Sequence, residues 1–293
     1  MPTLTNKKIP LGSISLTLSS VRRMWRELNE VVSEQGEIEL ARLVKPTDQS
    51  AEEFETYKEN ARRDTFKILG TVEFENGDAV HDTDPEIVKV EDEGPRIRVI
   101  HLSNITPYQQ TVGVRPEHAF EVIIDLRTPA LFDAGSVLSE PTPNNTSLAI
   151  SGNRPGWQGG LEAVVRRNIT RRRPIRTWFH GGMIYDLFLF VVALPLALYA
   201  CWAFEPFVSK WLGLTSPVVV GAAYLYIALS AIWIYRFMFS YAKWAFPFTE
   251  IIDQNSSPAR HRALWWSLVV ALLFKPLTSL AGEAWKNALG LSL

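Results

Sequence analysis

The side chains best suited to chemistry in this sequence are an imidazole and two carboxylates that lie within four residues. His81, Asp82 and Asp84 offer nitrogen and oxygen donors of the kinds that bind a divalent metal. Asp84 precedes a proline, and aspartate before proline is also typical of a solvated turn. We therefore predict an acidic surface turn and no metal here, with a metal site at His81, Asp82 and Asp84 as the alternative interpretation.

Signatures of common enzyme active sites are absent from the sequence. It contains no GxxxxGK[ST], GxGxxG, HExxH or GxSxG pattern, so no motif predicts a nucleotide, a cofactor or an activated serine. His101, His118 and Asp125 are further candidates for catalysis, but they stand apart from His81 and from one another. We therefore predict no cofactor, and a membrane-tethered enzyme is the least favoured class of function.

A second group of chemically active side chains is a cluster of arginines in front of the most apolar part of the chain. Guanidinium groups near a membrane attract anionic lipid headgroups, each contributing about 1 kcal/mol. The sequence predicts a basic amphipathic helix over residues 156–176 that lies on the inner leaflet; alternatively, its apolar face packs on the preceding domain. The arginines are Arg166, Arg167, Arg171, Arg172, Arg173 and Arg176.

Two uncharged apolar stretches follow this cluster. Residues 187–204 and residues 216–235 contain 18 and 20 residues without a charged side chain. As helices they would be about 27 Å and about 30 Å long, which matches the hydrocarbon thickness of a bilayer. We predict that both cross a membrane; the alternative is a pair of buried helices in a soluble core. Tryptophans that suit membrane interfaces flank them: Trp178, Trp202, Trp211 and Trp244.

Two residues inside or near the apolar segments are candidates for function. A third segment, residues 263–282, either spans the membrane or is re-entrant, because Lys275 interrupts it. If it spans, Lys275 is an intramembrane charge that suits an ion or anion pathway; alternatively, this lysine snorkels to water. Pro195 lies within the first span, where it is either a hinge or pore residue or a tolerated membrane proline.

Small side chains recur at a spacing of four residues along the first span. Ala193, Ala197 and Cys201 would form a ridge that lets another helix approach closely. The expected partner is the second span of the same chain, or otherwise a second subunit. Cys201 is the only cysteine, so we assign it to this ridge and predict no disulfide.

The charge is divided between the two halves of the chain. Residues 1–165 carry 17 basic and 26 acidic side chains, whereas residues 166–293 carry 13 and 5. An acidic surface repels phosphates, so we predict no nucleic-acid partner. Basic residues flank the two spans and only Lys210 lies in the loop between them. The positive-inside rule therefore places the N-terminal domain in the cytoplasm of a multi-pass protein of the inner or plasma membrane.

The N-terminal part alternates helix and strand patterns. Apolar residues at helical spacing from position 21 to 32 predict a helix that ends at Gly36, and a second helix is expected over residues 51–63. Asn76-Gly77 is typical of a hairpin turn. These patterns predict an α+β domain with a mixed sheet of about five strands and one or two packed helices.

The predicted organisation has three parts, which limit the classes of function. Residues 1–155 form the cytoplasmic α+β domain, residues 156–176 the juxtamembrane helix, and residues 177–293 a helical membrane domain of two or three segments. We expect a sensor or interaction module coupled to a membrane hairpin, which binds a protein partner or a second copy and contacts anionic lipids. The alternative is an oligomeric channel or membrane-disrupting effector that the cytoplasmic domain gates.

Overall fold

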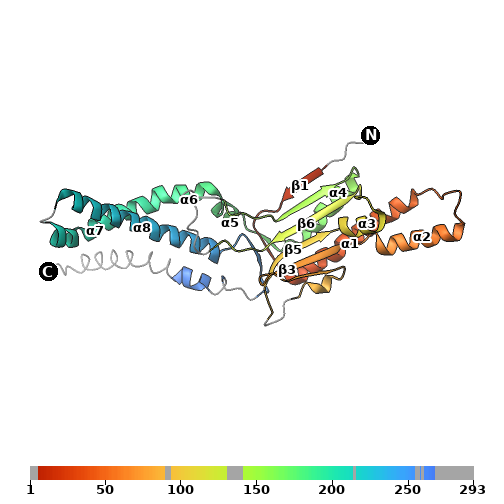
Figure 1. The fold of residues 1–293 in the computed structure, drawn as a ribbon, viewed down its shortest axis with the longest axis horizontal. Coiled ribbons are helices and arrows are strands. Elements are labelled where there is room, and N and C mark those ends of the chain that lie inside the picture. Colours follow the sequence, from red (N-terminus) through yellow and green to blue (C-terminus); the bar gives the residue numbers. More distant parts are fainter. Residues whose placement is uncertain are drawn as a thin grey trace, which may run out of the picture. The chain divides into compact units, whose positions relative to one another are not determined.

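The computed structural model describes residues 6–89, 94–130, 141–213, 216–254, 258 and 261–267 of the 293-residue chain. The chain forms two compact units (Figure 1). The first unit comprises Met1–Thr128, Glu140–Gly182 and Pro247–Gln254; the second comprises Pro129–Ser139, Met183–Phe246 and Asn255–Leu293. The chain therefore leaves the first unit, passes through the second and returns to the first.

A six-stranded sheet is the centre of the first unit (Figure 1). The strands lie in the order β1-β7-β6-β5-β3-β4, and every neighbouring pair is antiparallel. The sequence predicted a mixed sheet of about five strands, whereas this sheet has six and contains no parallel pair among the described residues. Its strands are β1 (Asn6–Pro10), β3 (Leu69–Phe74), β4 (Ala79–Asp82), β5 (Ile97–Ser103), β6 (Ala119–Asp125) and β7 (Ser147–Ser151).

The turn between β3 and β4 confirms the predicted hairpin. Gly77 has φ 93°, a left-handed conformation that glycine adopts without steric cost. Its backbone N–H donates to the carbonyl of Phe74 over 3.1 Å, which closes the turn. The hairpin was predictable because an Asn-Gly turn depends only on residues next to each other in the sequence.

Helices cover one face of the sheet and form the core with it. The helices α1 (Leu18–Ala41) and α4 (Pro155–Asn168) pack against each other, and side chains from both lie in one apolar cluster with the strands (Figure 1). The largest of these side chains, Trp25 and Trp157, are 0% and 2% exposed. This unit also contains the helices α2 (Ala51–Asp64) and α3 (Ile105–Val112) and the 3₁₀ turn η1 (Pro85–Ile87).

The predicted end of the first helix at Gly36 is wrong, because α1 continues to Ala41. A Cβ atom on Gly36 would lie only 2.4 Å from Cγ of Phe66. This glycine therefore permits close packing of a neighbouring ring within a continuous helix, and it does not terminate the helix. The second helix was predicted within one residue of its observed end, Asp64.

The segment between α4 and the first apolar helix also differs from the prediction of one helix over residues 156–176. The helix α4 ends at Asn168, and a two-residue strand β8 (Arg171–Arg172) and a short helix α5 (Pro174–Phe179) follow. The apolar face of α4 is buried in the domain core, as in the alternative interpretation. The buried residues on this face are Trp157, Leu161, Val164 and Val165.

A second, three-stranded sheet joins distant parts of the chain. Its central strand, β2 (Ile14–Leu16), pairs antiparallel with β8 and parallel with β9 (Thr249–Ile251). The strand β9 follows both apolar helices in the sequence, within residues predicted as part of the membrane domain. The backbone pairing of β9 with β2 places these residues in the first unit instead.

The second unit contains two helices that are long and apolar enough to cross a membrane. They extend over Gly182–Leu212 and Pro217–Ala245, with 31 and 29 residues. In each helix only 11% of the most apolar window is buried, so most of its apolar side chains face outward. The first combines α6 (Gly182–Phe188), the π-helical turn η2 (Leu189–Ala193) and α7 (Leu194–Leu212); the second is α8 (Pro217–Ala245).

Of the two functional candidates near the apolar segments, Pro195 lies within the described residues. Pro195 is the second residue after η2, and the first apolar helix continues through it. A wider turn at this point accommodates a proline ring that would otherwise meet the carbonyl four residues earlier. Of the third apolar segment, residues 263–267 are helical, while the remainder and Lys275 lie outside the described residues.

Candidate functional site

The candidate metal residues do not converge in the structure. Nδ1 of His81 lies 2.8 Å from the hydroxyl of Thr71 on the neighbouring strand β3. The carboxylate of Asp82 accepts from the backbone N–H of Thr83, and that of Asp84 from the backbone N–H of Glu86. Across the described residues, no three His, Cys, Asp or Glu side chains are grouped to hold a metal. The two carboxylates therefore act as caps of an acidic turn.

The other histidines belong to separate hydrogen-bond networks. Nε2 of His101 lies 2.7 Å from the carboxylate of Glu121 on the sheet face opposite the core helices. His118 is 5% exposed, and its Nδ1 lies 3.1 Å from both Gln35 and Glu39 on α1. The candidates for catalysis were His81, His101, His118 and Asp125. Neither network contains a second one of them.

Two of the clustered arginines pair with carboxylates on helices of the first unit. Arg166 contacts Glu162 one turn earlier on α4 over 2.6 Å, and Arg167 contacts Glu27 on α1 over 2.9 Å. Arg171 and Arg172 lie in β8. These four arginines therefore lie on elements of the first unit.

The remaining two arginines belong to a polar cluster that we call the hairpin clasp. It joins the segment before the first apolar helix to the segment after the second. Nη1 of Arg176 lies 3.0 Å from Oε1 of Glu250, and Arg173 approaches the same oxygen to 4.0 Å. The Arg176 and Glu250 side chains are only 12% and 11% exposed. The clasp consists of Ser13, Ser15, Arg173, Arg176, Thr177, Phe248 and Glu250.

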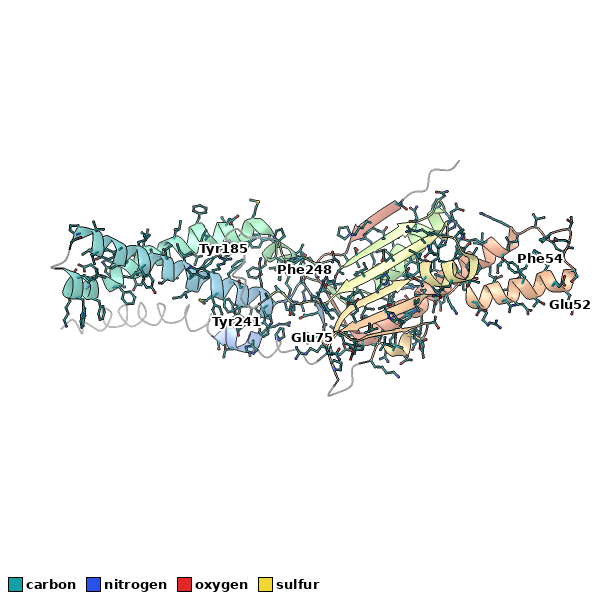
Figure 2. All side chains as sticks on the ribbon, viewed as in Figure 1. Glu52, Phe54, Glu75, Tyr185, Tyr241 and Phe248 are labelled. Carbon is teal, nitrogen blue, oxygen red and sulfur yellow. The ribbon has the colours of Figure 1, made fainter. Side chains whose placement is uncertain are left out.

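Hydroxyl groups from the N-terminal strand β2 and its preceding residue complete the clasp. Oγ of Ser15 donates to Oε1 of Glu250 over 3.1 Å. Ser13 donates its hydroxyl to the carbonyl of Phe248 over 2.5 Å, and its backbone N–H to the hydroxyl of Thr177 over 3.1 Å. Figure 2 labels Phe248 among the side chains of this segment. Ser13 and strand β2 thus contact both segments that flank the apolar hairpin.

The returning segment also reaches the core helix of the domain. Both carboxylate oxygens of Asp253 lie 3.0 Å from the backbone N–H of Leu18, the first residue of α1. Thr17 and Ser20 form a capping box at the same end. A carboxylate at a helix N-terminus satisfies an unpaired N–H and interacts favourably with the helix dipole. A residue that follows the second apolar helix therefore stabilises the helix at the centre of the domain.

A buried carboxylate links the large sheet to this region. Asp125, at the end of β6, is 0% exposed and accepts hydrogen bonds from Arg127 and from the backbone N–H of Asn145. Next to it, the hydroxyl of Thr146 lies 3.2 Å from that of Thr249 on β9. Asp125 therefore organises the loop that contacts the returning strand, and this role is structural.

Asp125 makes the stability of the first unit sensitive to acid. Burial raises the pKa of this carboxyl, but the hydrogen bonds from Arg127 and from the Asn145 backbone outweigh it, so the net pKa is lowered. The stabilisation is therefore present above about pH 4, the unfolded value, and is lost as pH falls through the folded pKa.

We expect Asp125→Asn to lower the thermal midpoint of the full chain at pH 7, because the amide is a weaker acceptor for Arg127. The difference from the unmodified chain should shrink as the pH falls progressively below about 4, where Asp125 itself becomes protonated. Thermal melts at a series of pH values in one detergent measure both quantities. A constant difference across that range would contradict the assigned role of the carboxylate.

The small residues of the first apolar helix lie inside the second unit. Ala193 and Ala197 are 0% and 3% exposed. Sγ of Cys201 lies 3.5 Å from the backbone carbonyl of Tyr224 on α8. Ala193 and Ala197 are therefore buried within the second unit, and Cys201 contacts the neighbouring helix α8.

The clasp was not anticipated from the sequence, because its partners lie up to 235 residues apart. One local signal was available: residues 248–252 are apolar or β-branched around Glu250, and Pro247 precedes them. That pattern is typical of a short strand. Comparison of the chain with protein-family models, with curated proteins and with solved structures gives no match.

Proposed function

We propose that the chain is an integral protein of the inner or plasma membrane, anchored by its two apolar helices. Their length and the outward orientation of their apolar side chains support this proposal. The first unit lies in the cytoplasm and serves as a sensor or protein-interaction module coupled to the membrane hairpin. The basic flanks of the two helices support this orientation.

The observation that carries the proposal is the hairpin clasp together with its link to α1. Both segments that flank the apolar helices pair with β2, which leads directly into α1. The two flanking segments belong to one compact unit, so both must lie on the same side of the membrane. This favours an even number of membrane crossings between them. A partner that shifts α1 would also shift Asp253, and with it the segment that follows α8.

Membrane orientation is tested with single cysteines in a Cys201→Ser background. We expect a membrane-impermeant maleimide to label Ser209→Cys, near the end of α7, on intact cells. Asn76→Cys, in the exposed β3–β4 turn, should react only after the cells are permeabilised. The reverse pattern would overturn the orientation. Release of the unmodified chain from membranes by carbonate would overturn membrane insertion.

Coupling is tested by removing the carboxylate that caps α1. We expect Asp253→Ala to cost about 1 kcal/mol at this helix terminus, so amides in its first turn should exchange about fivefold faster. Hydrogen exchange of the full chain in nanodiscs measures this. Ser50→Ala removes the N-cap of α2 and should leave the first turn of α1 unchanged. Unchanged exchange in α1 of Asp253→Ala would contradict the coupling.

A second candidate is an oligomeric channel or membrane-disrupting effector. The π-helical turn η2 in the first apolar helix favours it, since π-helical turns often occur at functional sites. Two spans cannot enclose a pore alone, so this function requires several copies. Light scattering of the full chain in nanodiscs distinguishes the two: a closed oligomer of four or more favours the channel, and a monomer or dimer favours the sensor.

A further inference from the structure

We infer that strand β4 is the docking site for an extended basic peptide of a partner protein, which adds to the large sheet beside β4. This inference names the kind of partner for the proposed interaction module and rests on that proposal. All of the residues that form the site belong to the first unit. Three features support it: an open strand edge, a groove beside that edge and the charge around both.

The edge of the sheet at β4 is open. Among the described residues β4 pairs only with β3, and all four of its residues are exposed. The opposite edge strand, β1 (Figure 1), carries Lys7, Lys8 and Pro10, which are residue types that prevent a further strand from adding. Strand β4 contains neither lysine nor proline. Its edge is therefore accessible to a strand from another chain.

The backbone groups of two β4 residues point toward this open edge. The Phe74 N–H donates to the Asp78 carbonyl over 2.9 Å at the turn of the hairpin. In an antiparallel pair, residues that exchange hydrogen bonds alternate with residues that do not. Val80 is therefore the next residue bonded to β3, and Ala79 and His81 direct their N–H and C=O groups away from β3. These are the groups that an added strand would bind.

A groove beside β4 gives room for the side chains of an added strand. Its volume is about 380 Å³, and residues from β3, from β4 and from around η1 line it. Val80, 44% exposed, lines it from β4. Side chains alternate along a strand, so every second residue of an added peptide would point to the same side as Val80. Apolar walls with carboxylates suit lysine or arginine, whose stems are apolar and whose tips are charged. The apolar lining residues are Phe74, Val80, Ile87 and Pro95, and the carboxylates are Asp84 and Glu86.

The segment around β4 is strongly acidic. Residues 73–89 contain six Asp and Glu side chains against one lysine, Lys89, which also lines the groove. Glu86 is paired with two arginines of α1, at 2.9 Å and 2.5 Å. Asp82 and Asp84 instead accept from backbone N–H groups, which carry no net charge. The charges of these two carboxylates therefore attract a basic partner.

The position of Asp82 also favours a basic residue in the added strand. Asp82 lies two residues after Val80, so both are on the face of β4 that borders the groove. A lysine or arginine opposite Asp82 would form an opposite-charge pair across the two strands. A second copy of β4 would bring carboxylates together instead, which disfavours a second copy of this chain as the occupant.

Fluorescence anisotropy with the full chain in phosphatidylcholine nanodiscs tests this site, since these lipids carry no net charge that would attract a cationic peptide. The probe is a short labelled peptide in which lysine and threonine alternate. We expect it to bind roughly tenfold more tightly than a peptide in which glutamate replaces lysine. In an antiparallel addition with the lysines on the groove side, the threonine N–H groups point to β4. N-methylation of the threonine amides should therefore weaken binding roughly tenfold, and N-methylation of the lysine amides should leave it unchanged.

Two variants of the chain test the strand edge and the charge separately. His81→Pro removes an N–H on the open edge and leaves the pairing with β3, so it should weaken binding of the lysine peptide roughly tenfold. Asp82→Asn with Asp84→Asn keeps the oxygens that accept from the backbone and should weaken this binding about fivefold. Glu52→Gln with Glu59→Gln is the matched control, because it removes two carboxylates from exposed positions on α2. It should leave binding unchanged.

Unchanged binding by His81→Pro, or after methylation of the threonine amides, would overturn strand addition. Equal binding of the lysine and glutamate peptides, or binding of neither, would overturn the basic partner. A dimer of the unliganded chain in light scattering that His81→Pro dissociates would make a second copy the occupant instead. Failure of membrane insertion itself is seen separately, in the cysteine labelling and the carbonate wash.

Discussion

Replacement of Gly70 by alanine is expected to destabilise the first unit by about 3 kcal/mol, the upper part of the range for overpacked cores. A Cβ atom at this position in β3 would lie 1.9 Å from Cη2 of Trp25, and 2.5 Å from Cζ2 and Cζ3. Trp25 is 0% exposed and is surrounded by core side chains, so its ring cannot move away. In most strands, replacing glycine by alanine stabilises the protein. At Gly70 the clash with Trp25 makes the same replacement destabilising.

Pulse proteolysis of the full chain in urea measures this loss of stability. Gly159→Ala is the matched control, because no atom lies within 4 Å of a Cβ built at this exposed position of α4. It should stabilise the unit by about 0.5–1 kcal/mol through helix propensity. Gly70→Ala combined with Trp25→Leu should lose less than the sum of the two single changes. Additive losses would contradict the predicted contact.

Glu250→Gln is expected to destabilise the hairpin clasp by about 3 kcal/mol, because it leaves two guanidiniums without their shared carboxylate. Glu250 receives Arg176 and Ser15 on one oxygen, and both charged side chains are nearly buried. Breaking one side of a buried ion pair is costly even where the pair itself adds little net stability. The expected consequence is faster hydrogen exchange in β2 and β9, beginning with the Ile252 N–H that donates to Leu16.

Hydrogen exchange and pulse proteolysis of the full chain in nanodiscs check this prediction. Glu37→Gln is the control, because Glu37 pairs with Arg62 at an exposed position on the helices of the same unit. Surface pairs contribute little, so this variant should retain the unmodified stability. Equal effects of the two substitutions would show that burial does not strengthen the Glu250 pair.

The features predicted from the sequence are those that depend on neighbouring residues. The Asn76-Gly77 turn and the helix near residues 51–63 follow from backbone conformation and helical spacing alone. The end of α1 was mispredicted at Gly36, because its packing against Phe66 is not encoded near it in the sequence. The same reason explains the division of residues 156–176, where pairing of Arg171 and Arg172 with β2 competes with helix continuation.

The candidate site could be predicted only in part. The arginines were singled out by their charge, but the carboxylates that they contact come from other segments. Glu250 lies 74 residues beyond Arg176 in the sequence, across both apolar helices. A chain pattern reveals neither this pairing nor the Asp253 cap of α1, because both depend on the parallel alignment of β2 with β9.

The parallel pairing of β2 with β9 also has a consequence for biosynthesis. Strand β9 is translated after both apolar helices, so a ribosome-bound chain has made its core helix long before the Asp253 cap exists. Closing a contact across 235 residues is slow relative to local folding. The N-terminal domain thus reaches its final fold only after the hairpin has been synthesised. A fully folded domain therefore indicates that the whole hairpin has been made.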